Sequence, residues 1–172
     1  MGAAIKLGDL KAVRWMLEKK ASPLRKCSST MIDRPLALAA WDNKPELVEI
    51  LLKNGGLGEN GESYGGFHGA IKHKMFKLVR RFIEKGCDLN EDYFNVTPLG
   101  TSLTCGKTNS GDARLVKLLL QAKADVLRLT KMCMSPYDDG ELTTMLNVAR
   151  THSNSTCTAL IQLASNSASK QT

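Results

Sequence analysis

The chain has 172 residues, of which 42% are hydrophobic and 5% aromatic, and its formal net charge is +7. This length fits one domain with a buried core, and the scarcity of aromatic residues favours thin stacked helices over a thick sandwich. No apolar run approaches the roughly 20 residues that a membrane helix needs, and the start, MGAAIK, contains no apolar signal segment. We therefore expect a monomeric intracellular protein, cytoplasmic or nuclear, without a membrane span.

A repeated apolar cassette runs along the chain. It consists of two apolar residues followed, four positions later, by two more, which places all of them on one helical face. The clearest copy lies in the helix predicted over 76–85, which stops at Gly86 because glycine adopts the left-handed conformation without a Cβ penalty. Successive copies are 35, 31, 37 and 44 residues apart, and they begin at Ala12, Leu47, Leu78, Leu115 and, as a weak last copy, Ala159.

In the first half, a short helix precedes Asp9, which is a good N-cap for a helix over 10–20. Pro35 and Pro45 suit the first turns of two further helices, because the missing N–H has no partner there in any case. Residues 57–65, LGENGESYG, are rich in glycine and poorly patterned. We expect them to form a mobile finger.

In the second half, residues 104–111, TCGKTNSG, form a polar insertion between two helices. The last unit has one helix within 141–152 and another from about 156 to 164, and polar residues dilute both apolar faces. This is typical of a terminal repeat, which meets water on one side. Residues 166–172 have no apolar anchor and are expected to fray.

These elements resemble the ankyrin repeat, a β-turn plus two helices of about 33 residues with a T-P-L-H-x-A signature. The segment 34–56 contains RPLALAA and PELVEILLKNGG in the family's order, and 97–100 reads TPLG. Residues 66–70, GFHGA, keep the histidine and the alanine, 135–137 read SPY, and the exits at 86–90 and 124–126 match the family's G-A-D-V-N. The resemblance covers nearly the whole chain.

The resemblance implies an all-α repeat solenoid of about five stacked helix-turn-helix units with β-turn or hairpin fingers. It would form a single domain over 1–165, followed by the tail at 166–172. The approximate repeats are 1–33, 34–64, 65–95, 96–133 and 134–165.

The resemblance also implies a scaffold that binds another protein through finger tips and inner helices. The candidate contact residues are Trp41, Lys72, His73, Asp92, Tyr93, Phe94, Arg128 and Lys131. Tyr93 and Phe94 are adjacent at a predicted tip and cannot both point inward, so either one anchors an interface or one packs on a neighbouring finger. Trp41 either contacts the partner or packs between repeats. Trp15 aligns with Ile50 and is expected to pack between repeats.

The positive charge lies in the first half of the chain. Residues 1–86 carry sixteen Lys and Arg against nine Asp and Glu, whereas 87–172 carry eight of each. The densest part includes Lys77, Arg80, Arg81 and Lys85, opposite an apolar helix face. It is either a solvated surface or a docking patch for an acidic partner. An alternative function follows, the binding of an anionic ligand: an acidic protein, a lipid headgroup or a nucleic acid. Nucleic acid is disfavoured because few aromatic residues interleave with these cations.

No catalytic or metal-binding constellation is recognisable. The five cysteines include no CxxC pair, which favours free thiols, buried or half-buried, over a disulfide framework or a zinc site. Residues 106–108, GKT, lack the preceding strand and glycine of a phosphate-binding loop, so we interpret them as a solvated loop. His68 occupies the family's TPLH position, and the resemblance implies that it bonds to neighbouring backbone. We expect no catalysis, cofactor or metal.

Overall fold

The computed structural model describes residues 1–27, 32–105, 111–130, 142–152 and 155–169. Within these ranges the regular secondary structure consists of helices, apart from two isolated β-bridges, which confirms the all-α class. No helix in the described ranges is long and apolar enough to cross a membrane. Contacts divide the chain into two compact units, Met1–Asp88 and Leu89–Thr172. The single domain over 1–165 stays a prediction.

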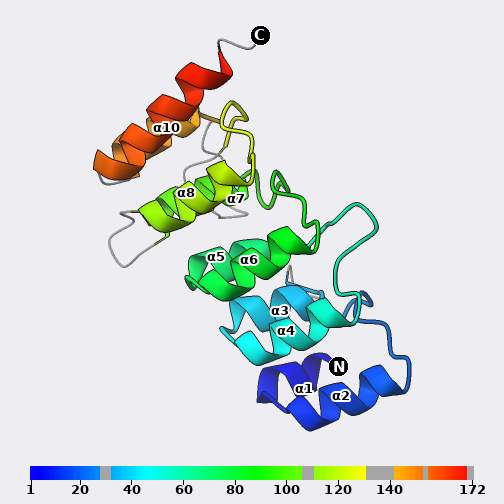
Figure 1. Ribbon diagram of the computed structural model, residues 1–172. Helices are drawn as coiled ribbons and strands as arrows, with labels where there is room; N and C mark the ends of the chain where they lie inside the picture. Colours follow the sequence, from blue (N-terminus) through cyan, green and yellow to red (C-terminus); the bar gives the residue numbers. More distant parts are fainter. Residues whose placement is uncertain (28–31, 106–110, 131–141, 153–154, 170–172) are drawn as a thin grey trace. The chain divides into compact units, whose positions relative to one another are not determined.

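The first unit contains helices α1 to α6, arranged as three pairs. α3 packs against both α1 and α5, and α4 packs against both α2 and α6 (Figure 1). Each pair also packs internally, α1 on α2, α3 on α4 and α5 on α6. The helices span α1 Gly2–Leu7, α2 Leu10–Glu18, α3 Pro35–Trp41, α4 Pro45–Lys53, α5 Gly66–Lys72 and α6 Phe76–Glu84.

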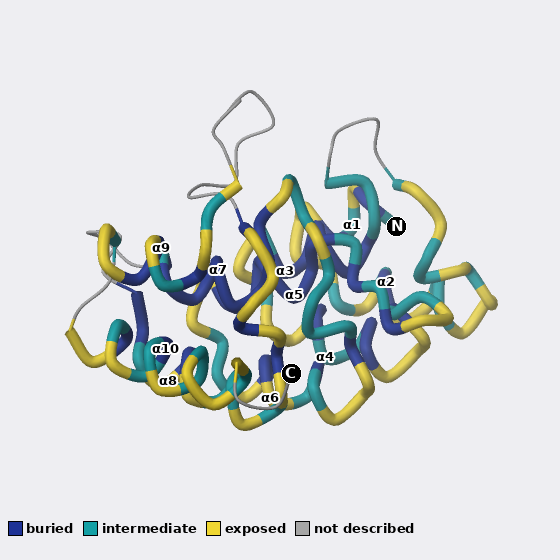
Figure 2. The backbone as a smooth tube through the Cα atoms, turned by 90° about the horizontal axis from the view of Figure 1, so that it is seen from above, coloured by how far each residue is buried: buried dark blue, intermediate teal, exposed yellow. Residues whose placement is uncertain are grey.

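Helices α3 and α5 of the first unit differ in burial from helices α4 and α6 (Figure 2). Pro35 to Ala40 on α3 and Gly66 to Ile71 on α5 are buried throughout, whereas α4 and α6 bury only the cassette face. A Cβ at Gly69 would lie 3.0 Å from the Cβ of Ala40, so a residue without a side chain is what lets α5 approach α3 this closely. The cassette prediction is confirmed for α4 by its buried residues, Leu47, Val48, Leu51 and Leu52.

Helix stops in both units take the left-handed conformation. Gly86 has φ 75°, and the N–H of Cys87 then donates to the carbonyl of Phe82 at 3.0 Å, which satisfies a helix-terminal acceptor. The same backbone pattern follows α2, where Lys20 has φ 61°, and α8, where Lys123 has φ 67°. The stop predicted at Gly86 is therefore confirmed, and the stops at Lys20 and Lys123 place lysine in a conformation that favours glycine.

Residues 57–65, which the sequence predicts to be a mobile finger, form a compact turn in the structure, and their mobility stays a prediction. The N–H of Gly58 donates to the carbonyl of Glu62 at 2.9 Å, and the Glu62 carboxylate accepts from the N–H and side-chain amide of Asn60 at 3.1 and 3.0 Å. The N–H of Asp88 donates to the carbonyl of Gly61 at 3.0 Å, which fixes the turn to the exit of α6. Such local side-chain bonds order a segment that has no apolar pattern.

The second unit contains α7 Pro98–Thr104, α8 Ala113–Gln121, α9 Met145–His152 and α10 Ser155–Ala168. α7 packs on α8 and α9, and α10 packs on α8 and α9. The hydroxyl of Thr97 caps α7 by accepting from the N–H of Gly100 at 3.1 Å, and its own N–H donates to the hydroxyl of Thr130 at 3.2 Å. The solvated loop predicted at 106–108 lies outside the described residues.

The apolar face predicted for the last helix is wrong. Cys157 and Ile161 are buried, while Leu163, assigned to the cassette, is 66% exposed. The hydroxyl of Thr158 donates to the carbonyl of Ala149 on α9 at 3.1 Å, and this contact helps to set which face of α10 turns inward.

The last helix also extends further than expected. It continues to Ala168, so 166–168 are helical rather than part of a frayed tail. The Ser167 hydroxyl donates to the carbonyl of Leu163 at 2.9 Å, and the Gln162 amide donates to Asn166 at 3.0 Å. These bonds support a polar helical turn that lacks an apolar anchor.

Trp15 does not pack between helix pairs as expected, because it is 59% exposed. Arg81 takes the position on α6 that Trp15 takes on α2, and it forms an ion pair with Glu49 on α4. α2 packs on α1 and on α4, and neither contact buries the Trp15 side chain.

Candidate partner-binding surfaces

Three of the predicted contact residues come together in the first unit, at the ends of α3 and α5. The ammonium of Lys72 lies 4.7 Å from the centre of the Trp41 ring, and the indole N–H of Trp41 donates to the carbonyl of Gly65 at 2.9 Å. Nε2 of His73 lies 3.0 Å from the carbonyl oxygen of Trp41. We name Trp41, Lys72 and His73 the Trp41 cluster. Its tryptophan is therefore held at its ring, its N–H and its backbone.

A second side chain joins neighbouring helix pairs in the same way. The ammonium of Lys44, before α4, donates to the carbonyl of Ile5 at 2.7 Å and to that of Lys6, at the end of α1. It also lies 3.5 Å from the carboxylate of Asp42. Cations stabilise helix C-termini, but the sequence did not single out Lys44, because the helix end that it meets depends on how the pairs stack.

Tyr93 and Phe94 form a tight turn in the second unit. The N–H of Tyr93 donates to the carbonyl of Val96 at 3.1 Å and the N–H of Val96 donates back at 3.2 Å. Phe94 and Asn95 have φ 55° and 59°, which corresponds to a two-residue turn with both central residues left-handed. The rings of Tyr93 and Phe94 meet edge to face, 4.4 Å between centroids, and both residues are half-buried.

The segment before this turn is tied to the segment after α8. The side chain of Asn90 accepts from the N–H of Asp125 at 2.8 Å. The carboxylate of Asp92 lies 3.9 Å from the guanidinium of Arg128, and both side chains are 43% exposed. Asp92, Tyr93, Phe94 and Arg128, which we name the aromatic turn, therefore lie together in the second unit. Lys131 lies outside the described residues.

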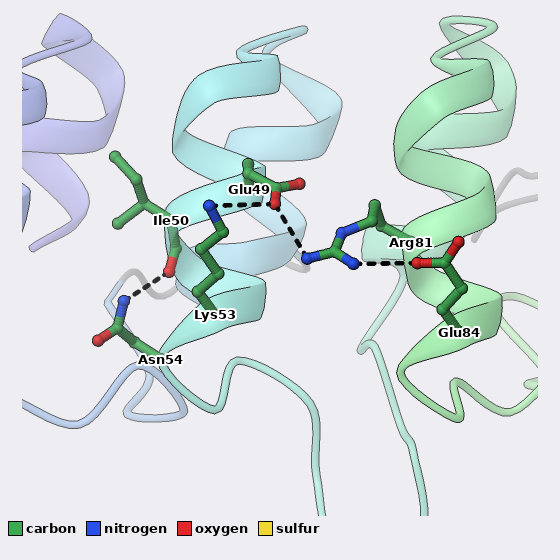
Figure 3. A network of polar contacts seen from close by, with 6 residues as sticks. All are labelled: Glu49, Ile50, Lys53, Asn54, Arg81 and Glu84. Atoms are coloured by element: carbon green, nitrogen blue, oxygen red, sulfur yellow. Dashed lines mark hydrogen bonds and ion pairs between the residues drawn. The ribbon is translucent and has the colours of Figure 1, made fainter.

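The four basic residues predicted on α6 are not equivalent. Arg81 lies between two carboxylates, 3.4 Å from Glu49 on α4 and 3.0 Å from Glu84 (Figure 3). The hydrogen bond to Glu84 and the charge of Glu49 raise the pKa of Arg81. Glu49 also meets Lys53 at 3.5 Å. Arg81 therefore links α6 to α4, whereas the other three, Lys77, Arg80 and Lys85, are exposed.

The first unit also has a groove between α2 and α4. It is lined by Arg14, Leu17, Glu18, Ile50, Lys53 and Asn54. None of the predicted contact residues belongs to it. Its charges of both signs give no indication of a ligand.

The described residues contain no group of three or more His, Cys, Asp or Glu side chains that could hold a metal ion. Cys27, Cys87, Cys105 and Cys157 are free thiols, buried or half-buried, as the sequence predicted for them. Burial raises the pKa of the Cys157 thiol, with a smaller contribution from Asp112, so it is protonated at neutral pH. His68 is fully buried on α5; its bond to neighbouring backbone stays a prediction.

The chain was also compared with known proteins. No protein-family model matches it, and no curated protein is significantly similar to it.

Proposed function

We propose that this chain is a protein-binding module of the ankyrin-repeat type, a solenoid of about five two-helix repeats that binds a partner without catalysis. The stacked pairs within each unit, their left-handed stops and the Thr97 cap support a repeat architecture. A repeat array presents a rigid surface, because each pair is ordered by its neighbours, and rigidity lowers the entropy lost on binding.

The observation that carries this proposal is the conformation of Phe94. A left-handed residue other than glycine costs roughly 1–2 kcal/mol, and the turn at 93–96 normally takes Asn, Asp or Gly at both central positions. The edge-to-face contact with Tyr93 returns only about 0.5–1.5 kcal/mol. Turn stability alone therefore gives little reason for a phenylalanine here, whereas a partner that receives a rigid aromatic side chain does.

The test begins with affinity purification of the partner, using the full chain as bait. Phe94→Asn removes the aromatic ring and places a favoured residue in the turn. We expect the affinity for the purified partner to fall about tenfold or more, as at interface anchors, while helicity and stability are kept or improved.

Asn95→Gly is the matched control. It substitutes the neighbouring central residue with one that the turn also favours and leaves both rings in place, so binding should be unchanged. Full binding by Phe94→Asn would overturn the assignment of the aromatic turn to the interface. Equal loss in both variants would attribute the effect to the turn and not to the ring.

A further inference from the structure

We infer that the Trp41 cluster of the first unit binds a negatively charged peptide segment of the partner. The inference rests on the proposed function and adds the chemistry of the ligand. Residues 1–86 carry sixteen Lys and Arg against nine Asp and Glu. Such an excess raises the local concentration of acidic ligands and speeds their association.

The cations of this unit divide into those already engaged and those available. Arg81 is held by two carboxylates, and Lys44 is held by two carbonyls and Asp42. By contrast, within the described residues Lys72 contacts the Trp41 ring but no carboxylate, and Lys77, which follows on α6, has no ion pair. The turn from α5 to α6 therefore presents two cations, Lys72 and Lys77, that remain open to a ligand.

The Trp41 cluster also holds the Lys72 side chain more rigidly than an isolated surface lysine is held. The indole N–H bond to Gly65 and the contact between His73 and the Trp41 carbonyl fix the ring. The ring then positions the Lys72 ammonium, an interaction worth about 0.5–1 kcal/mol at an exposed site. A carboxylate that reaches Lys72 meets a side chain whose freedom is already reduced, which lowers the entropy cost of the ion pair.

A peptide fits these observations better than a nucleic acid. Lys72 lies over one face of the Trp41 ring, so that face is not open to the stacking of a base. Carboxylates are interspersed among the cations, with Asp42 beside Lys44 and Glu84 beside Arg81. A continuous phosphate backbone would meet these negative charges, whereas single acidic side chains can be placed between them.

The test measures binding of the full chain to a fluorescent peptide of alternating Glu and Ala. The comparison ligands are the same peptide with Gln for Glu, a thymidine oligonucleotide, and phosphatidylserine vesicles. We expect the Glu peptide alone to bind, with an affinity that falls as salt rises. Lys72→Glu should weaken it about tenfold or more, because attraction becomes repulsion at the contact.

Lys85→Glu is the matched control, because it makes the same charge change at an exposed lysine at the C-terminal end of α6, away from the cluster. It should alter the affinity by less than about twofold. Circular dichroism checks that both variants are folded. Equal binding of the Glu and Gln peptides, an equal effect of the two variants, or tighter Lys72-dependent binding of the oligonucleotide or the vesicles would overturn the inference.

The purified partner separates this inference from the proposed function. If both Phe94→Asn and Lys72→Glu lose binding to the partner, the proposed function and this inference are both supported. Loss by Phe94→Asn with full binding by Lys72→Glu overturns the acidic segment and leaves the protein-binding function standing.

Discussion

The contact between the 57–65 turn and the exit of α6 depends on Gly61, and Gly61→Ala should destabilise the first unit. Gly61 has φ +82°, and a Cβ there would lie 2.2 Å from the carbonyl oxygen of Gly86 and 2.9 Å from the N of Asp88. Both atoms belong to the backbone, so the clash cannot be relieved by a side-chain rotation. The turn must move away, which breaks the 3.0 Å bond from the Asp88 N–H to the Gly61 carbonyl.

The loss of unfolding free energy in Gly61→Ala has two parts, a conformational cost and a lost hydrogen bond. The left-handed conformation costs alanine roughly 1–2 kcal/mol, and the smaller entropy of the unfolded chain offsets about 0.4–1 kcal/mol of this. Loss of the hydrogen bond adds about 1 kcal/mol. We therefore expect Gly61→Ala to lower the free energy of unfolding by about 1–2.5 kcal/mol.

Gly55→Ala measures the conformational cost alone. Gly55 has φ +79°, but nothing lies within 4 Å of a Cβ there, so its substitution should cost only about 1 kcal/mol. Urea unfolding followed by tryptophan fluorescence is the assay, since Trp15 and Trp41, the two tryptophans of the chain, both belong to the first unit. A Gly61→Ala variant no less stable than Gly55→Ala would show that the contact between Gly61 and the exit of α6 does not stabilise the first unit.

Two further predictions concern a helix stop and a carboxylate. Lys20→Gly should stabilise the first unit by about 0.5–1 kcal/mol, because it relieves the φ of 61°; Lys19→Gly, at φ −78°, should not, and equal effects in urea unfolding would contradict this. Hydrogen bonds from the Asn60 side chain lower the pKa of Glu62 below its ordinary 4.5, so its stabilising effect is complete above that pH and is lost as pH falls through the lowered pKa. The stability difference between the natural chain and Glu62→Gln should therefore shrink in acid, and a difference independent of pH would sink this explanation.

Local signals in the sequence predicted most of the helices. The Asp9 cap, the prolines at the starts of α3 and α4, and the stop at Gly86 all act within a few residues of themselves, so each could be recognised without the fold. The cassette face of α4 followed from periodicity for the same reason. Asp9, for example, accepts from the N–H of Ala12 at 2.9 Å, as an N-cap does.

Features that depend on packing or side-chain chemistry were missed. The burial of Cys157 in place of Leu163, and the exposure of Trp15, depend on which neighbours the fold supplies. Arg81 was predicted as part of a basic patch, but its role follows from Glu49, which is distant in sequence.

The candidate site was predictable in part. The residue choices at Trp41, Lys72 and His73 came from position in the repeat pattern, and the structure brings these three into contact. The strain at Phe94 was not predictable, because nothing in the sequence indicates that a phenylalanine adopts a left-handed turn.

We propose that a partner binds at the Trp41 cluster and at the aromatic turn. Amide hydrogen exchange of the full chain, alone and with its purified partner, tests it most directly. We expect new protection at 41–44, at 72–75 and at 92–96, with exchange on the outer faces of α4 and α6 unchanged. Protection confined to the groove between α2 and α4, or to helices α2, α4 and α6, would contradict binding at these two sites.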